Sequence, residues 1–498
     1  MRSHGWRASR VGFASVVVAL CAGLLGTWVA VPSASAQGGA RYVVAVPVCP
    51  RTRPGQFACN AVALRRVAST TPGAVVVRRA AGASSSGPAG GLTPADLARA
   101  YGFDPTGSGA DQTVAIIDWG NDPTIATDLN TFDSHYDLPL CTTTNGCFTK
   151  LNQRGKPKPL PPDEGTAIEI SLDVEAVHAV CQRCKIVLIE ADAPTDANLD
   201  VAVNEAAALG ANEISTSYGA ADPSGPSASD SAAYNHPGVV ITASAGDDGY
   251  LDFDRWVDTP HGGPAANPSA PQIPASLATV VAVGGTALYL NQDGTRRYET
   301  VWNENGTEDA LETGGLGPQG ASGGGCSIGV NAPIWQQQLP TWSQTACGSR
   351  RLATDVSAVA DPYTGFDTYN TSDHGPGWET IGGTSLSSPI IAAIYALAGG
   401  SHGISYPAQT LYTHIGTGLF YDVTVGGNGF CNGAGATQCG NQNQSIFHGV
   451  PRGVVDCDFP ASGTTPNPGD LACDAAPGYD GPTGVGTPIG IVGFATYG

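Results

Sequence analysis

The stretch Gly382–Pro389 reads Gly-Gly-Thr-Ser-Leu-Ser-Ser-Pro and contains a serine, Ser385, that could act as a nucleophile. Two glycines allow a sharp backbone turn, and the apolar run that follows ends at Gly399, so a helix is predicted to begin close to Ser385. Unpaired N–H groups and the helix dipole favour negative charge at such a position. A hydroxyl there is suited to nucleophilic attack, and its own N–H can hold an oxyanion. The alternative is a serine that only caps a buried helix.

A nucleophilic serine needs a base, usually a histidine held by an aspartate, but none of the nine histidines has a suggestive sequence context. Glu169 and Asp173 lie four residues apart and would share one face of a helix. Two carboxyls this close raise each other's pKa and can share a proton, so the pair could accept the Ser385 proton at mildly acid pH. Glu175 is expected to face solvent. The alternative is an ordinary acidic helix face.

A third acidic candidate, Asp247, lies in the run Ser244–Gly249, directly after an apolar segment. If it is protonated, it could donate a hydrogen bond to a developing oxyanion, as a neutral carboxylic acid can. The alternative is a common Asp-Asp-Gly turn.

The elements that would position these groups alternate between apolar strands and helices. We expect a short helix capped by Thr93, helices at 169–180 and 196–209, and strands at 113–118, 185–191, 213–218, 239–243 and 279–283. This alternation predicts an α/β fold with a doubly wound, mostly parallel sheet and helices on both faces. In such sheets the functional residues lie at the carboxyl ends of the strands. Beyond about residue 400 the chain is rich in Gly, Asn and Cys, which is typical of loops.

Together these segments resemble the sedolisin family of serine-carboxyl peptidases, which have a subtilisin-like fold. The resemblance covers roughly residues 92–488. It is carried, in order, by Glu169 with Asp173, Gly246–Gly249, Val281–Thr286, Ser322–Gly325 followed by Pro333–Gln336, and Gly383–Pro389.

The resemblance implies a role for each acidic candidate. Ser385 would be the nucleophile, and Glu169 would be the general base and then the general acid. Asp173 would orient Glu169, while Asp247 would donate to the oxyanion beside the Ser385 N–H. Asp118, at the end of a predicted strand, is expected to support this site or line the substrate cleft, with a purely structural role equally open.

The loop-rich C-terminal part also resembles the calcium site of that family. Asp422 and Asp480 would supply carboxylate oxygens, Val423, Ala476 and Gly478 would supply backbone carbonyls, and water would complete the shell. Oxygen ligands at six positions suit Ca2+, whose expected role is structural. The alternative is two turns that each contain an acid.

The N-terminus divides into three predicted regions. Residues 1–36 combine Arg2, Arg7 and Arg10 with an apolar stretch and an Ala-Ser-Ala ending, which is typical of a secretory signal peptide. Residues 37–91 are expected to be a short pro-segment that ends in a Gly/Ser-rich linker, and residues 92–498 to be the peptidase domain. The resembling family usually has a much larger pro-domain.

Twelve cysteines remain after the signal, an even number that favours disulfides in an exported chain. Neighbours in the sequence could pair in order, but the sequence does not fix the connectivity. Cys181 and Cys184, separated by two residues, could instead be a redox or zinc half-site, although a structural disulfide is favoured.

The formal net charge of −20 argues against nucleic acid as a partner. We therefore expect a secreted, monomeric endopeptidase that acts on protein or peptide substrates at acid pH and is free of the membrane after signal removal. Two alternatives remain: a subtilisin that uses Asp118, a histidine and Ser385, and an inactive binding or adhesion module built on the same scaffold.

Overall fold

The computed structural model describes residues 41–49, 57–68, 75–77, 87–162, 165–221, 223–252, 270–303, 320–372, 377–431, 455–456 and 471–495. Residues Tyr42–Gly498 form one compact unit. The predicted signal peptide, residues 1–36, lies outside the described residues, as do residues 253–269, which belong to the segment after Asp247. Within the described ranges, no helix combines the length and the apolar character that crossing a membrane would require.

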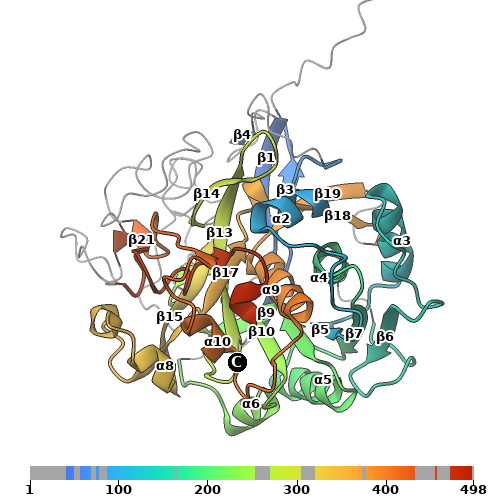
Figure 1. Cartoon of the computed structure of the whole chain (residues 1–498). Coiled ribbons are helices and arrows are strands. Elements are labelled where there is room, and N and C mark those ends of the chain that lie inside the picture. Colours follow the sequence, from blue (N-terminus) through green and yellow to red (C-terminus); the bar gives the residue numbers. More distant parts are fainter. Residues whose placement is uncertain are drawn as a thin grey trace, which may run out of the picture. The chain divides into compact units, whose positions relative to one another are not determined.

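A mostly parallel sheet forms the centre of this unit (Figure 1). In the described part of the chain it has eight strands in the order β14-β13-β10-β8-β5-β7-β6, with β17 paired to β13. Only the pairing of β14 with β13 is antiparallel. The strands are β5 (Thr113–Trp119), β6 (Phe148–Asn152), β7 (Lys185–Ala191), β8 (Glu213–Thr216), β10 (Val240–Ser244), β13 (Val281–Leu290), β14 (Arg296–Val301) and β17 (Val356–Val359). The predicted doubly wound sheet is confirmed, because these buried apolar runs pair side by side.

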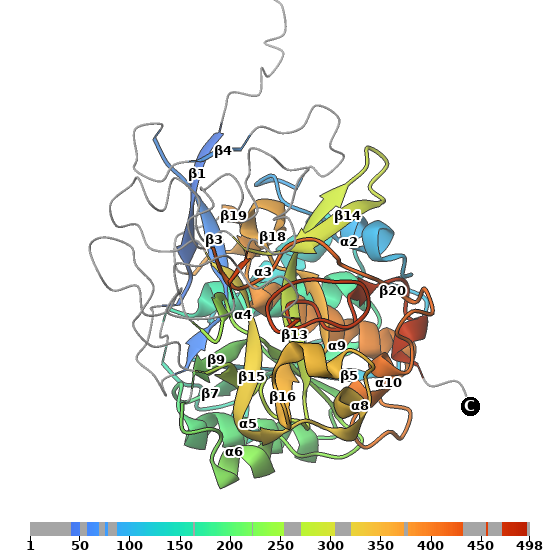
Figure 2. The ribbon, with the colours of Figure 1, turned by 90° about the vertical axis from the view of Figure 1, so that its left-hand side faces the viewer.

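Two groups of helices cover the two faces of this sheet (Figures 1 and 2). On one face α4 (Ala167–Val180) packs against α9 (Thr384–Ala398) and α3 (Ile125–His135). On the other face α5 (Asp196–Ala208) packs on β5 and β7 and against α6 (Ala228–Ala233). The remaining described helices are short: α2 (Pro94–Tyr101), α8 (Ile334–Gln337), α10 (Ala408–Tyr412) and the 3-10 turns Trp342–Thr345, Pro362–Thr364 and Val492–Phe494. Thr93 caps α2 as predicted.

One expectation about α4 is wrong. Glu175 does not face solvent: its side chain is fully buried and accepts a hydrogen bond from the Tyr369 N–H at 2.8 Å. Every residue of α4 is buried, because the helix lies between the sheet, α9 and β18 (Phe366–Asn370). Polar residues on this helix therefore face the protein interior rather than water.

Strands from the N-terminal segment pair with strands of the rest of the unit (Figure 2). A five-stranded sheet has the order β18-β19-β3-β1-β4, with β19 (Gly377–Gly382), β3 (Val62–Arg66), β1 (Arg41–Pro47) and β4 (Val75–Val77). A three-stranded sheet joins β12 (Gln272–Ile273), β9 (Tyr218–Ala221) and β2 (Ala58–Cys59). The smaller remaining sheets are β11 (Asp248–Tyr250), β15 (Ala321–Asn331) and β16 (Arg350–Ala353); β20 (Phe420–Tyr421) and β23 (Thr487–Pro488); and β21 (Phe430–Cys431) and β22 (Val455–Asp456).

The last residues of the predicted linker are anchored. The Asp367 carboxylate accepts hydrogen bonds from the N–H groups of Ala89 and Gly91, both at 2.7 Å. Where the chain enters α2, it is therefore fixed to β18.

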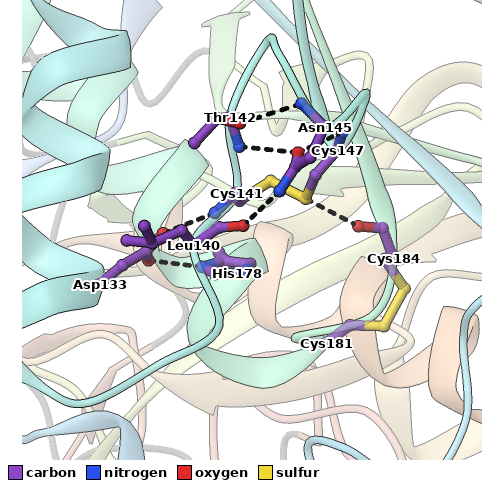
Figure 3. The surroundings of a disulfide bond; sticks show 9 residues. All are labelled: Asp133, Leu140, Cys141, Thr142, Asn145, Cys147, His178, Cys181 and Cys184. Carbon is purple, nitrogen blue, oxygen red and sulfur yellow. Dashed lines mark hydrogen bonds and ion pairs between the residues drawn. A yellow bond between two sulfur atoms is a disulfide. The ribbon is translucent and has the colours of Figure 1, made fainter.

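Four disulfides join cysteines that are neighbours in the sequence: Cys49–Cys59, Cys141–Cys147, Cys181–Cys184 and Cys326–Cys347. Cys181 and Cys184 are thus a structural bridge, and the Cys147 sulfur lies 3.5 Å from the Cys184 carbonyl oxygen (Figure 3). Cys473 is also disulfide-bonded. If neighbours pair in order, Cys439 would join Cys431 and Cys457 would join Cys473, but Cys439 and Cys457 lie outside the described residues.

Candidate active site

Ser385 lies in the first turn of α9, as its sequence predicts. The preceding Gly383 has φ 92° and is the N-cap. Only glycine adopts this conformation without strain, and a Cβ there would come within 2.2 Å of the Asn60 carbonyl oxygen. The Ser385 hydroxyl is fully buried and donates to the Ser217 carbonyl at 2.9 Å. The absence of a side chain at Gly383 therefore leaves room beside the Ser385 N–H for a peptide carbonyl.

Three carboxyl groups converge close to this turn. Glu169 and Asp173 project from one face of α4, and Asp118 lies near the end of β5. One oxygen from each lies within 4.8 Å of the others, and none of the three residues is more than 1% exposed. No oxygen of the three accepts a hydrogen bond of normal geometry from a described residue. The predicted pairing of Glu169 with Asp173 is thus present, and Asp118 joins it.

Burial sets the protonation of this cluster. Desolvation, followed by the charges of Asp173 and Asp118, raises the pKa of Glu169 well above its usual range, and the Ser385 hydroxyl opposes this only in part. Desolvation and the Asp118 charge likewise raise the pKa of Asp173. The cluster therefore retains protons at a pH where exposed carboxyls are ionised. It can share and relay protons under acid conditions.

Asp118 links the cluster to the neighbouring strand. Burial, and then the charge of Glu190 in register on β7, raise the pKa of Asp118 to about 7. Burial also raises the pKa of Glu190 to about 7, although Lys150 lies 2.8 Å from its carboxylate. The Asp118 charge in turn raises the pKa of both Glu169 and Asp173.

Asp247 follows β10 and faces the start of α9. Its Oδ1 accepts from the Thr384 N–H at 2.7 Å and from the Thr384 hydroxyl at 2.8 Å. Its Oδ2 is buried and has no hydrogen-bond partner among the described residues. Desolvation raises the pKa of Asp247 well above its usual range, against the opposing effect of Thr384. A proton on Oδ2 would make this oxygen a donor beside Ser385.

A peptide segment that no sequence motif assigned to the site occupies the space in front of Ser385. The Ser385 N–H donates to the Asn60 carbonyl at 2.7 Å, and the Asn60 N–H donates to the Ser217 carbonyl at 3.1 Å. Both the Asn60 oxygen and the free Asp247 Oδ2 lie within 2.6 Å of the point where a Gly383 Cβ would be. The Asn60 carbonyl thus lies where an oxyanion would form. Neither Asn60 nor Ser217 stands in a motif that could have marked it in the sequence.

The described histidines have other partners. His178 is buried in α4 and its Nδ1 lies 2.7 Å from Asp133, beside the Cys141–Cys147 bridge (Figure 3). His236 contacts Asn204, and His402 contacts the carbonyl of Ala398. The carboxyl cluster around Glu169 contains no histidine from the described residues.

The predicted calcium ligands lie in two neighbouring loops. Asp422 accepts from the Gly478 N–H and Asp480 from the Ala476 N–H, both at 2.9 Å. Burial raises the pKa of Asp480 to about 8, and the charge of Asp422 adds to this. Val423 is buried beside Asp422. A buried carboxyl with a second carboxyl nearby fits a cation, because a bound cation would offset both charges.

Comparisons with known proteins bear on this site. Residues 165–417 match the subtilase family. Kumamolisin of Bacillus sp. (strain MN-32) is 28% identical over 418 residues, which cover 80% of this chain and 62% of kumamolisin. Xanthomonalisin of Xanthomonas sp. (strain T-22) is 30% identical over 394 residues, covering 72% of this chain and 45% of xanthomonalisin. Sedolisin of Pseudomonas sp. (strain 101) is 34% identical over 200 residues, which cover 39% of this chain and 30% of sedolisin.

A solved structure shares the fold. It is Pseudomonas sedolisin, a serine-carboxyl proteinase complexed with two molecules of pseudo-iodotyrostatin, with a TM-score of 0.59, 26% identity, and coverage of 81% of this chain and 96% of that one. The chain spans less than two thirds of the length of each of the three curated relatives.

Proposed function

Because this chain belongs to the subtilase family, and within it to the sedolisins, we propose that it is a serine-carboxyl endopeptidase that hydrolyses protein or peptide substrates at acid pH. The observation that carries the proposal is that the Ser385 N–H and Asp247 Oδ2 lie beside one peptide carbonyl, that of Asn60, while the Ser385 hydroxyl is close enough to the buried Glu169–Asp173 pair to affect its pKa.

In the proposed reaction, Glu169 takes the hydroxyl proton of Ser385 as Oγ attacks the substrate carbonyl. The C–N bond then breaks, the leaving amine takes the proton from Glu169, and an ester joins Ser385 to the acyl part. Water, deprotonated by the same carboxylate, hydrolyses the ester. Asp173 orients Glu169 and shares its proton, supported by the three-carboxyl cluster that includes Asp118.

The developing oxyanion would receive two hydrogen bonds. One comes from the Ser385 N–H, which already donates to the Asn60 carbonyl. The other comes from protonated Asp247, whose Oδ1 is held by Thr384 so that Oδ2 can donate. Acid pH is expected because this donor must keep its proton.

We further propose that Asp422 and Asp480, with the carbonyls of Val423, Ala476 and Gly478, hold one structural Ca2+ that fixes the two loops. Secretion after removal of residues 1–36, and a monomeric enzyme without nucleic acid or membrane partners, complete the proposal. The disulfides support the extracellular part of it, and the net charge of −20 supports the absence of a nucleic-acid partner.

Incubation of a denatured protein with the full chain across pH 3–8 tests the function, with Ser385→Ala as the matched variant. We expect cleavage with an acid maximum for the wild type and none for Ser385→Ala, which should keep the same circular dichroism spectrum. Equal cleavage by both proteins, or a maximum above neutrality, would refute the assignment. A complete absence of cleavage would favour a binding module.

A further inference from the structure

The segment in front of Ser385 lies in the register of a bound substrate. Strand β2 runs antiparallel to β9, with Ala58 opposite Gly219 and Cys59 opposite Tyr218. The next residue, Asn60, makes the two backbone contacts to Ser217 and Ser385 described above. The bond that faces the nucleophile is therefore the one between Asn60 and Ala61.

The Asn60 side chain is held in a polar pocket. Its Nδ2 donates to Ser244 Oγ at 2.8 Å and to Gln272 Oε1 at 3.0 Å. Gln272 donates in turn through Nε2 to Asp252 Oδ1 at 2.6 Å. Because Asp252 accepts this bond, the Gln272 oxygen is turned toward Asn60. Asn60, Ser244 and Gln272 are no more than 3% exposed, so these contacts are shielded from solvent while the segment is in place.

Two glycines make room for this arrangement. A Cβ at Gly219 would lie 2.0 Å from Gln272 Oε1, and one at Gly246 would lie 2.9 Å from Gln272 Cδ. Gly246 also has φ 112°, a conformation that favours glycine. The backbone around the pocket is thus shaped to accept the Gln272 side chain, and Gln272 presents an acceptor to the bound residue.

We propose that this pocket selects asparagine at the position immediately before the cleaved bond. The proposal rests on the peptidase function proposed above and names its substrate class. A leucine of similar size would leave Ser244 and Gln272 unpaired in a buried site. An ionised aspartate would place a carboxylate oxygen against the Gln272 oxygen, which Asp252 holds in place.

A second contact defines the other end of the segment. Phe57, three residues before Asn60, is buried and packs edge-on against Tyr218 with ring centroids 5.7 Å apart. A synthetic peptide with the sequence of residues 57–62, Phe-Ala-Ala-Asn-Ala-Val, with alanine in place of Cys59, therefore carries both features. It is the reference probe, and Leu or Asp in place of its Asn gives the two comparison peptides.

The test measures kcat/KM for the three peptides with the full chain at pH 5.5, where a peptide aspartate is largely ionised. We expect the Asn peptide to exceed both others by roughly 10- to 100-fold, as the loss of one or two hydrogen bonds implies. The full chain with Asn60→Leu should turn over the Asn peptide faster, because its own segment fits the pocket less well.

The variant Gln272→Met should lower the preference for Asn over Leu by about tenfold or more. Gln338→Met, which changes an exposed glutamine at the end of α8, is the control and should leave the preference unchanged. Cleavage without preference for Asn, or a preference that survives Gln272→Met, overturns the inference and leaves the peptidase function standing. If neither the wild type nor Asn60→Leu cleaves any peptide, the proposed function itself fails, and the inference fails with it.

Discussion

The buried Asp118 should make the protein less stable as pH rises. Its pKa lies at about 7 against an ordinary 3.8, first because it is buried and then because of the Glu190 charge. Below pH 4 the carboxyl is protonated in both the folded and the unfolded chain. Between about pH 4 and 7 the folded chain keeps a proton that the unfolded chain has lost, so the free energy of unfolding falls over this window.

The size of this loss follows from the two pKa values. Each pH unit between them corresponds to about 1.4 kcal/mol, which would give roughly 4 kcal/mol for Asp118. Part of the rise depends on Glu190, which titrates over the same range, so we expect roughly 2 to 4 kcal/mol. Asp118→Asn removes this titration. It should therefore match its parent near pH 4 and exceed it in stability at pH 8.

Urea unfolding at pH 4 and pH 8 measures this difference. Ser385→Ala serves as the parent so that self-digestion does not interfere. Asp111→Asn, which changes an exposed carboxyl, is the control and should follow the parent at both pH values. If Asp118→Asn lost as much stability between pH 4 and 8 as its parent, the carboxyl would not be titrating as its burial implies, and the reasoning would be refuted.

Three further outcomes follow from the site. In peptide-cleavage assays, Glu169→Gln should lower kcat by about 10²- to 10⁴-fold, whereas His236→Ala should change kcat less than twofold. The reverse pattern would indicate a histidine-dependent subtilisin. Asp247→Leu should lower kcat by about 10²- to 10³-fold, and Asp247→Asn should lose less because an amide can still donate; equal losses would contradict an oxyanion role. Added Ca2+ should raise the Tm of thermal unfolding more at pH 7 than at pH 5, since the Asp480 carboxyl must ionise to bind the ion. Asp480→Asn should abolish this rise in Tm. An unchanged rise in this variant would place the ion elsewhere.

Much of the site could be predicted because its signals are local. Glycines before Ser385 and an apolar run after it predicted a helix start, and the four-residue spacing of Glu169 and Asp173 predicted one helix face. The same local reasoning was wrong for Glu175. Helical spacing gives the direction of a side chain, but it does not say whether β18 or water lies there.

The sequence by itself determined the alternation of strands and helices, the turn that presents Ser385 and the pairing of Glu169 with Asp173, because these depend on neighbours a few residues apart. Only the tertiary structure decided that Asp118 joins that pair, since β5 and α4 meet through packing. It alone placed Asn60 against Ser385, which is 325 positions further along the chain. Such contacts arise from sheet register and layer packing, which no short stretch of sequence encodes.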